Sequence, residues 1–290
     1  MNVRNVFLIV AVFMVCQVCT MAQELLAIQQ ISWSPKGDKI CFTAKATKSD
    51  ELFVIHTDGT GLKQLTNDEL RDAHPSWSHD GTTIVYSKDI KKYDPRLYVI
   101  NPDGTGEKCL FDDGYSDSFG TYSPDDTRLA YMSKRDTHWQ LFMYNFKDKS
   151  RTQILTSDAN DFNPVWSYDG KNIGFESDRN GNDQDDIFIL NLPTGKLKQV
   201  TNSQEYNDVY PFFSPVSNQL LFLSLRNRIG YLFTINPDGT AEKKIAEKVL
   251  YASWSPDGKK IAFISYKNGI DKRSVEIINL KQGSIIEVIK

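Results

Sequence analysis

Four aspartates recur at one position of this 290-residue chain, five residues before an aromatic residue. They are Asp72, Asp117, Asp161 and Asp208, and we call them the aspartate register. A second register stands three residues before these four aromatic positions and before two further ones, Trp33 and Trp254. Its members are Gln30, His74, Phe119, Asn163, Tyr210 and Tyr251. Polar groups that converge among aromatic rings are the usual composition of a recognition site. We therefore expect both registers to form a ligand-binding surface, whose carboxylates favour a cationic or amide-rich partner.

Both registers also have a structural interpretation. An aspartate at the start of a strand can accept hydrogen bonds from the backbone N–H groups of a turn, and would then recur for that reason alone. The second register changes its residue type from repeat to repeat, which favours a functional surface, although a solvated channel tolerates the same variety. His74 follows Asp72 by two residues and has the chemistry of a general base or a metal ligand. A single histidine is, however, more often a hydrogen-bonded structural residue.

The usual catalytic motifs do not occur in the sequence. There is no Gly-x-Ser-x-Gly elbow and no His-Glu-x-x-His pattern. We therefore expect no catalytic residue, no bound metal and no cofactor. The segment Asp178–Asp186 spaces its oxygen-bearing side chains as a calcium loop does, but Ile189 stands where such a loop has its closing glutamate. Calcium binding stays an open alternative for this segment.

The aromatic positions belong to a short phrase that recurs six times, in its fullest form as Trp-Ser-Pro-Asp-Gly. The six aromatic anchors are Trp33, Trp77, Tyr122, Trp166, Phe213 and Trp254. Neighbouring anchors are about 41 to 47 residues apart, which is the length of one propeller blade. Each repeat holds four short runs rich in β-branched and aromatic residues, with Asp-Gly turns between them. The sequence therefore predicts an all-β fold, a six-bladed β-propeller of four-stranded antiparallel blades.

The first 22 residues have the pattern of a secretory signal peptide. Arg4 precedes an apolar run that ends at Val15, and small residues lead up to Ala22, where we expect cleavage. The run is too short to span a bilayer core of about 30 Å, so we expect no membrane insertion after cleavage. The residues before Cys16 and Cys19 fit a lipoprotein signal poorly. We expect residues 23–290 to form one periplasmic or secreted propeller.

Charge and cysteine content narrow the function further. The net charge of −3 offers no basic surface, so we expect no nucleic-acid partner. Cys41 and Cys109 remain after cleavage and lie in different repeats, so we expect two free, buried thiols. The first repeat has a complete first strand and the last repeat a complete fourth strand at Ile285–Ile289. We therefore expect the ring to close by packing of the first blade against the last.

The repeat resembles that of the TolB-type propellers, the periplasmic proteins of the Tol–Pal system and their relatives. The segments that carry the resemblance are Trp254–Phe263, Leu97–Gly106 and Ser177–Asn182. It extends over about the whole of residues 23–290, without the α/β domain that precedes the propeller in TolB proper. The resemblance implies a non-catalytic binding module of the cell envelope, which we expect to be a monomer. Its partner would be an envelope protein or peptide that docks over the channel mouth.

A different class of function stays open. Some propellers with this repeat resemble metal-assisted glycan lyases. The alternative is therefore a secreted polysaccharide-acting enzyme that uses His74 and the carboxylates near it.

Overall fold

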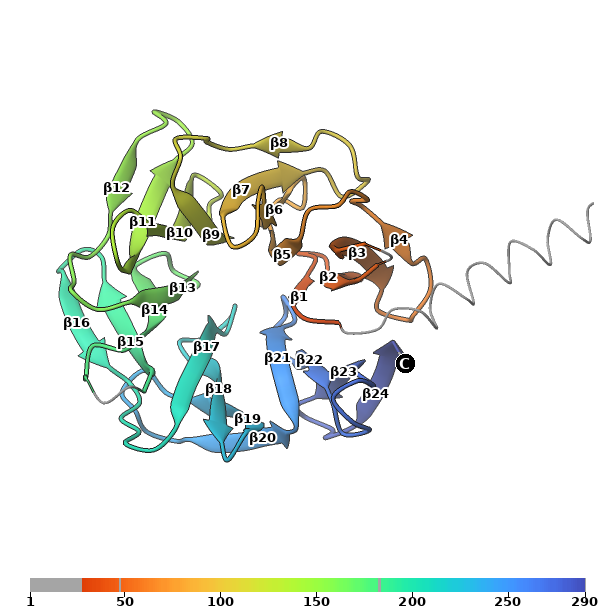
Figure 1. The fold of residues 1–290 in the computed structure, drawn as a ribbon. Helices are drawn as coiled ribbons and strands as arrows, with labels where there is room; N and C mark the ends of the chain where they lie inside the picture. Colours follow the sequence, from red (N-terminus) through yellow and green to blue (C-terminus); the bar gives the residue numbers. More distant parts are fainter. Residues whose placement is uncertain (1–27, 47, 182–183, 290) are drawn as a thin grey trace, which may run out of the picture.

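Each repeat folds into one antiparallel sheet, because its apolar runs are short and tight turns separate them. The computed structural model describes residues 28–46, 48–181 and 184–289. Over these residues the chain forms six four-stranded sheets arranged as a ring, each built from four consecutive strands (Figure 1). The predicted six-bladed β-propeller is thus confirmed. The predicted signal peptide, residues 1–22, lies outside the described residues.

The strands have the following bounds. The innermost strands, which line the central channel, are β1 (Ile31–Trp33), β5 (Asp72–Trp77), β9 (Ser116–Tyr122), β13 (Asp161–Trp166), β17 (Asn207–Phe213) and β21 (Val249–Trp254). The second strands are β2 (Lys39–Lys45), β6 (Ile84–Asp89), β10 (Arg128–Lys134), β14 (Asn172–Ser177), β18 (Leu220–Arg226) and β22 (Lys260–Ser265). The third strands are β3 (Asp50–His56), β7 (Pro95–Ile100), β11 (Trp139–Asn145), β15 (Asp186–Asn191), β19 (Ile229–Ile235) and β23 (Ser274–Asn279). The outer strands are β4 (Lys63–Gln64), β8 (Lys108–Cys109), β12 (Arg151–Gln153), β16 (Lys196–Gln199), β20 (Lys243–Glu247) and β24 (Ile285–Ile289).

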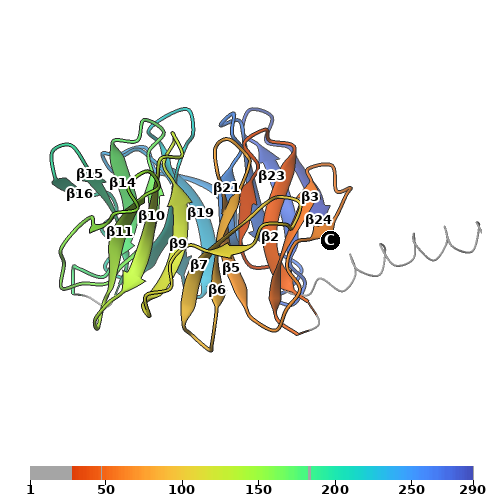
Figure 2. The same cartoon turned by 90° about the horizontal axis from the view of Figure 1, so that it is seen from above.

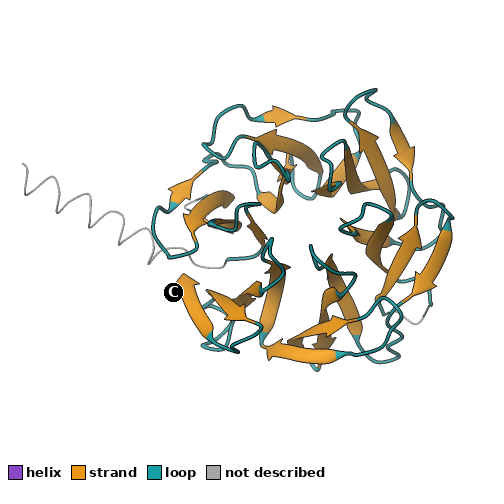
Figure 3. Ribbon diagram, turned by 180° about the vertical axis from the view of Figure 1, so that it is seen from behind, coloured by secondary structure: helices purple, strands orange, loops and turns teal. Residues whose placement is uncertain are grey.

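The strands cross the thickness of the ring, so each innermost strand begins at one face and ends at the other (Figure 2). The described part of the chain consists of strands and loops (Figure 3). No helix among these residues is long and apolar enough to cross a membrane.

The Ser-Pro-Asp-Gly phrase makes the turn between the first and second strands. In blade six the Ser255 hydroxyl donates to Asp257 Oδ1 at 2.7 Å and accepts from the Lys260 backbone N–H at 2.9 Å. The bond from Ser255 is the main cause that lowers the pKa of Asp257, so this carboxylate is ionised at neutral pH. Gly258 follows at φ 65°, in the left-handed region that favours glycine. The phrase therefore recurs because it encodes one tight turn per blade.

The core lies between neighbouring blades. One cluster joins Ala130 and Leu141 of blade three to Trp166 and Phe175 of blade four, all buried. The aromatic anchors fill these interfaces, and three of the tryptophans also donate their indole N–H to a backbone carbonyl of the preceding blade. Trp33 Nε1 donates to the Ser253 carbonyl at 3.2 Å, Trp166 Nε1 to Thr121 at 3.2 Å and Trp254 Nε1 to Phe212 at 3.3 Å. Each acceptor is the residue just before the neighbouring anchor, so these three indoles link blade one to six, blade four to three and blade six to five.

The ring closes through side chains packed between blades one and six, an interface we call the closure seam. Its buried cluster includes Ile28 and Ile31 of blade one with Ile264 and Ile289 of blade six. The bond from Trp33 to Ser253 crosses this seam. Each described blade is built from four consecutive strands, so within residues 28–289 no strand is exchanged between the ends, as the sequence predicted.

Both cysteines of the described region are free thiols. Cys41 is buried, as expected, and burial raises its pKa. Cys109, expected to be buried, is only half-buried, because it lies in the short outer strand β8.

Candidate binding site at the central channel

The second register lies inside the channel because the innermost strands bulge there. The pairing of β5, β9, β13 and β17 with the next strand is interrupted at this position. Four residues of the register sit in the bulge with positive φ: His74 at 54°, Phe119 at 53°, Asn163 at 51° and Tyr210 at 53°. Non-glycine residues rarely adopt this conformation, and bulges re-aim side chains.

Aromatic rings of this register form a continuous arc across the channel. The ring centroids of His74 and Phe119 are 3.3 Å apart, and Phe119 stacks on Tyr210 at 6.3 Å. Tyr210 contacts Tyr251 at 5.2 Å, and Tyr251 meets Phe212 edge-on at 5.3 Å. We call this arc the aromatic plug. It joins blades two, three, five and six, so side chains fill much of the channel at this level.

Amide side chains from the remaining two blades complete this layer, and both are buried. Gln30 accepts from the Thr43 hydroxyl at 2.8 Å, and Asn163 donates to Glu176 Oε1 at 2.6 Å. The other oxygen of Glu176 accepts from the Tyr210 backbone N–H at 2.7 Å. The structure therefore brings all six members of the second register together, and adds Glu176.

The plug carries little charge at neutral pH. Burial raises the pKa of Glu176 to about 8 and that of Tyr210 to about 12, so both side chains are mainly protonated. Burial also lowers the pKa of His74 well below its usual range, which leaves a neutral imidazole. His74 Nδ1 lies 3.4 Å from the Ser118 hydroxyl.

The aspartate register does not line the channel opening. Asp72, Asp117 and Asp161 are fully buried and Asp208 is 5% exposed, each within its own blade. Burial raises the pKa of Asp72 to about 8 and those of Asp117 and Asp208 to about 6. The structure therefore does not bring these four carboxylates together at one opening.

In blade four an arginine engages the aspartate of the register. Asp161 pairs across the sheet with Ser177. Arg179 Nη2 donates to Asp161 Oδ1 at 2.6 Å and Arg179 Nε donates to the Ser177 hydroxyl at 2.9 Å. The guanidinium also lies over the rings of Phe175 and Phe188. Blades three and five hold the same residue types, and Asp117 faces Ser133 and Asp208 faces Ser224 across the sheet. Among the described residues, however, no arginine forms an ion pair with these two aspartates.

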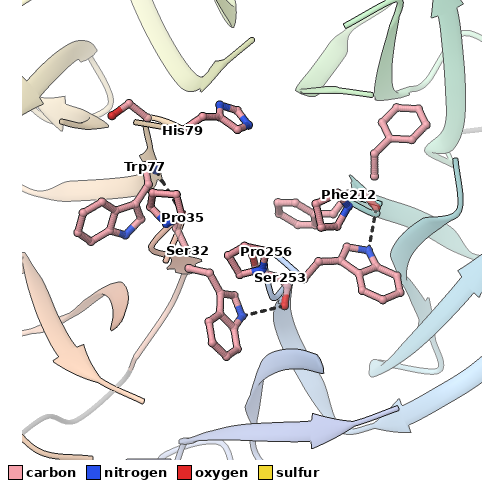
Figure 4. Close-up of a pocket in the computed structure, with 12 residues that line it drawn as sticks. Ser32, Pro35, Trp77, His79, Phe212, Ser253 and Pro256 are labelled. Carbon is pink, nitrogen blue, oxygen red and sulfur yellow. Dashed lines mark hydrogen bonds between the residues drawn. The ribbon is translucent and has the colours of Figure 1, made fainter. Parts of the chain in front are cut away.

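An open cavity lies where the innermost strands end, on the far side of the plug from their starts. Two adjoining hollows of about 400 Å³ and 250 Å³ share Ser32, Trp77, Phe212 and Ser253 among their lining residues. We call the two together the funnel, and Figure 4 shows the side chains that line its larger part. Phe212 lines the funnel and also contacts the plug through Tyr251. The plug is therefore the floor of the funnel.

The wall of the funnel has a polar half and an apolar half. The residue just before each anchor faces the channel, and four of the six carry a hydroxyl: Ser32, Ser76, Thr121 and Ser253. We call these four the hydroxyl belt. In the neighbouring blades four and five the residue before the anchor is apolar: Val165 and Phe212. One side of the wall can thus hydrogen-bond a ligand while the other side packs against apolar groups.

Prolines and aromatic rings form the rim. Pro35, Pro124, Pro215 and Pro256 come from the turns that follow the anchors. The imidazole of His79 lies at the mouth (Figure 4), where its Nδ1 is 3.2 Å from Asp126 Oδ1. His79 is held from outside the funnel, because its backbone N–H donates to Asp126 Oδ1 at 2.8 Å. Asp126 replaces the glycine of the usual Asp-Gly turn and keeps a positive φ of 55°.

The calcium alternative concerns a segment in which two carboxylates, those of Asp178 and Asp186, already have protein partners. Asp178 accepts from the backbone and the side chain of Asn160, both at 2.8 Å. Asp186 accepts from Asn180 at 2.7 Å and from the Ser203 backbone at 2.9 Å. Residues 182–183 lie outside the described part. Within that part no group of three or more His, Cys, Asp and Glu residues is placed to hold a metal ion.

Sequence reasoning missed Glu176 and the funnel wall. Glu176 was detectable as the one charged residue in its strand, where it follows the apolar Phe175. The bulges had a signal as well, since a proline or glycine follows each positive-φ residue of the second register: Pro75, Gly120, Pro164 and Pro211. The hydroxyl belt stands beside the anchors in four of the six repeats, but the sequence alone does not show that these side chains face one cavity.

Fold and channel together define a closed six-bladed propeller with a plugged, funnel-shaped channel. Residues 22–211 match the profile of the Tricorn protease N-terminal beta propeller domain. The chain therefore belongs to this family of propellers.

Two curated relatives share part of the sequence. Dipeptidyl-peptidase 5 of Porphyromonas gingivalis is 25% identical over 91% of this chain and 48% of its own length. The Tol-Pal system protein TolB of Francisella tularensis subsp. mediasiatica is 25% identical over 47% of this chain and 32% of its own length. The chain thus spans between about a third and a half of the length of these relatives.

Solved structures share the fold. A putative TolB from Agrobacterium tumefaciens superposes with a TM-score of 0.69 at 18% identity, over 80% of this chain and 87% of that protein. An oligogalacturonate lyase in complex with manganese gives 0.65 at 15% identity, over 91% of this chain and 78% of the lyase. A TolB-like propeller fold is therefore established.

Proposed function

We propose that this chain is a non-catalytic binding module of the bacterial cell envelope that recognises a protein or peptide over one end of its channel. The observation that carries the proposal is the funnel, an open cavity with an aromatic and proline rim on a rigid, closed ring. Such a surface gives a bound segment both apolar contacts and hydrogen bonds with little loss of protein entropy. The resemblance to TolB supports an envelope partner.

The location and state of the protein are parts of the same proposal. We place the propeller in the periplasm after removal of residues 1–22, as a monomer without cofactor. The second register contributes from below, as the floor on which the bound segment ends. The buried aspartate register acts on the stability of the blades and has no contact with the partner.

The test is capture of partners from an envelope extract of the protein's own host. The full chain is compared with Ser76→Trp, which fills the funnel from the hydroxyl belt, and with Ser284→Trp, which places the same side chain on an exposed outer turn. We expect a protein that the wild type and Ser284→Trp retain and that Ser76→Trp loses. Equal retention by all three chains would refute the funnel as the site.

A second candidate is a metal-dependent enzyme acting on acidic polysaccharides, which the fold shared with the manganese-bound lyase favours. His74 would be its base or metal ligand, since a neutral imidazole suits either role. The assay is turnover of acidic oligosaccharides with added Mn²⁺. Turnover that His74→Ala abolishes would establish the enzyme in place of the binding module.

A further inference from the structure

The funnel wall is unusual for this protein because it is uncharged. The chain is 24% charged, yet the residues that line the two hollows include no Asp, Glu, Lys or Arg. His79 is their one titratable side chain apart from tyrosine, and it stands at the mouth, where its ring contacts the carboxylate of Asp126. The floor is also mainly uncharged at neutral pH, since Glu176 is buried and protonated.

This composition decides which part of a partner can enter. A charged group that moved from water into the funnel would lose hydration and find no opposite charge on the wall. A peptide backbone loses little, because the hydroxyl belt can replace water for its N–H and C=O groups. Two belt members, Ser76 and Ser253, form no hydrogen bond through their side-chain oxygens within the described region. They are half-buried at the channel surface.

The depth of the funnel limits the length of the inserted segment. The second register stands three residues before the anchors, a distance of about 10 Å along a strand at roughly 3.3 Å per residue. The aromatic plug occupies that level, so the segment stops there. About three extended residues fit between the plug and the anchors, with an apolar side chain placed against Phe212 and Val165.

We infer that the funnel binds the uncharged apex of a peptide loop, about three residues long, and rejects loop apices that carry a charge. This inference rests on the proposed function and adds its specificity. It also differs from the cationic partner that the aspartate register suggested, because those carboxylates are buried in the blades and do not face the funnel.

The experiment selects phage-displayed random decapeptides against the immobilised full chain. Affinities of the enriched peptides are then measured by fluorescence anisotropy on wild type, Ser76→Asp and Ser284→Asp. Ser284→Asp adds the same charge on an exposed turn. We expect enriched peptides to share an uncharged apolar core of about three residues. Ser76→Asp should weaken their binding at least about tenfold, as expected for burial of an unpaired charge, and Ser284→Asp should not.

A peptide that carries the opposite charge tests whether the effect of Ser76→Asp is electrostatic. A lysine placed in the peptide core should restore binding to Ser76→Asp and abolish binding to the wild type. Equal binding of charged and uncharged cores to the wild type would overturn the inference and leave the proposed function intact. Enriched peptides that bind Ser76→Asp as well as wild type would overturn it too, provided Phe212→Ala abolishes their binding. Failure to enrich any peptide would count against the proposed function and remove the inference with it.

Discussion

Substitution of Trp33 by phenylalanine tests how the ring is held closed. The indole Nε1 donates to the Ser253 carbonyl at 3.2 Å across the closure seam. Phenylalanine keeps most of the buried ring but removes the donor, which leaves the carbonyl without its partner. Loss of a hydrogen bond of this kind costs about 1 kcal/mol, and the smaller ring adds a packing loss of similar size. We expect the free energy of unfolding to fall by about 2 kcal/mol.

The matched control for this loss of stability is Trp254→Phe. Trp254 makes the same bond to the Phe212 carbonyl at 3.3 Å, between blades five and six, where the chain is continuous. Urea unfolding followed by circular dichroism gives both free energies and both m-values. If the closure seam is an interface like the others, the two losses agree within about 0.5 kcal/mol and the m-values are unchanged. A loss near zero for Trp33→Phe, or a lower m-value for that variant alone, would refute the reasoning.

Three further changes test the buried interior. Burial raises the pKa of Asp117 to about 6. The native state therefore holds its proton to a higher pH than the unfolded state, and the free energy of unfolding falls by up to about 3 kcal/mol between pH 4 and pH 6. Urea titrations at both pH values should show a smaller fall for Asp117→Asn. A fall equal to that of the wild type would contradict this prediction. Gly230→Ala would place a Cβ 1.9 Å from the Val249 carbonyl oxygen and should lower the free energy of unfolding by about 3 kcal/mol. The control Gly195→Ala should lower it by about 1 kcal/mol, because its Cβ meets open space and only the positive φ of 67° is unfavourable. Equal losses for the two variants would count against a close approach at Gly230. Lys88 is 4% exposed and bridges two carboxylates that are 40% and 38% exposed. Lys88→Met should therefore cost only about 1 kcal/mol, because water can solvate both carboxylates. A melting temperature that falls by ten degrees or more would contradict this.

The fold was predictable from the sequence because its information is local and repeated. An anchor such as Trp254, with the turn at Asp257-Gly258, specifies the end of one strand and the start of the next. Six copies at blade spacing leave one architecture that buries every apolar face. Ring closure followed from the same reasoning, since the first and last repeats were each complete.

The site was harder to predict because it depends on burial and direction. The regular spacing of the aspartate register is visible in the sequence. Only the packing of the blades shows that a carboxylate such as Asp161 is buried and accepts a hydrogen bond from Arg179. The second register was found, yet its inward direction comes from bulges at residues such as His74. The hydroxyl belt was overlooked because small residues such as Ser76 have no chemical signature until the channel places them side by side.

The construction of each blade from four consecutive strands has a consequence for how such a ring can change. The order of blades along the chain is cyclic, and the described ends meet at the closure seam, where Ile28 and Ile289 share one core cluster. A circular permutant that joins these ends and opens residues 67–71, between β4 and β5, should therefore keep the same ring. A gene can likewise gain or lose a whole repeat without changing how the strands of any other blade pair. The number of blades can therefore change by duplication, while the turns and indole bonds of the other blades stay the same.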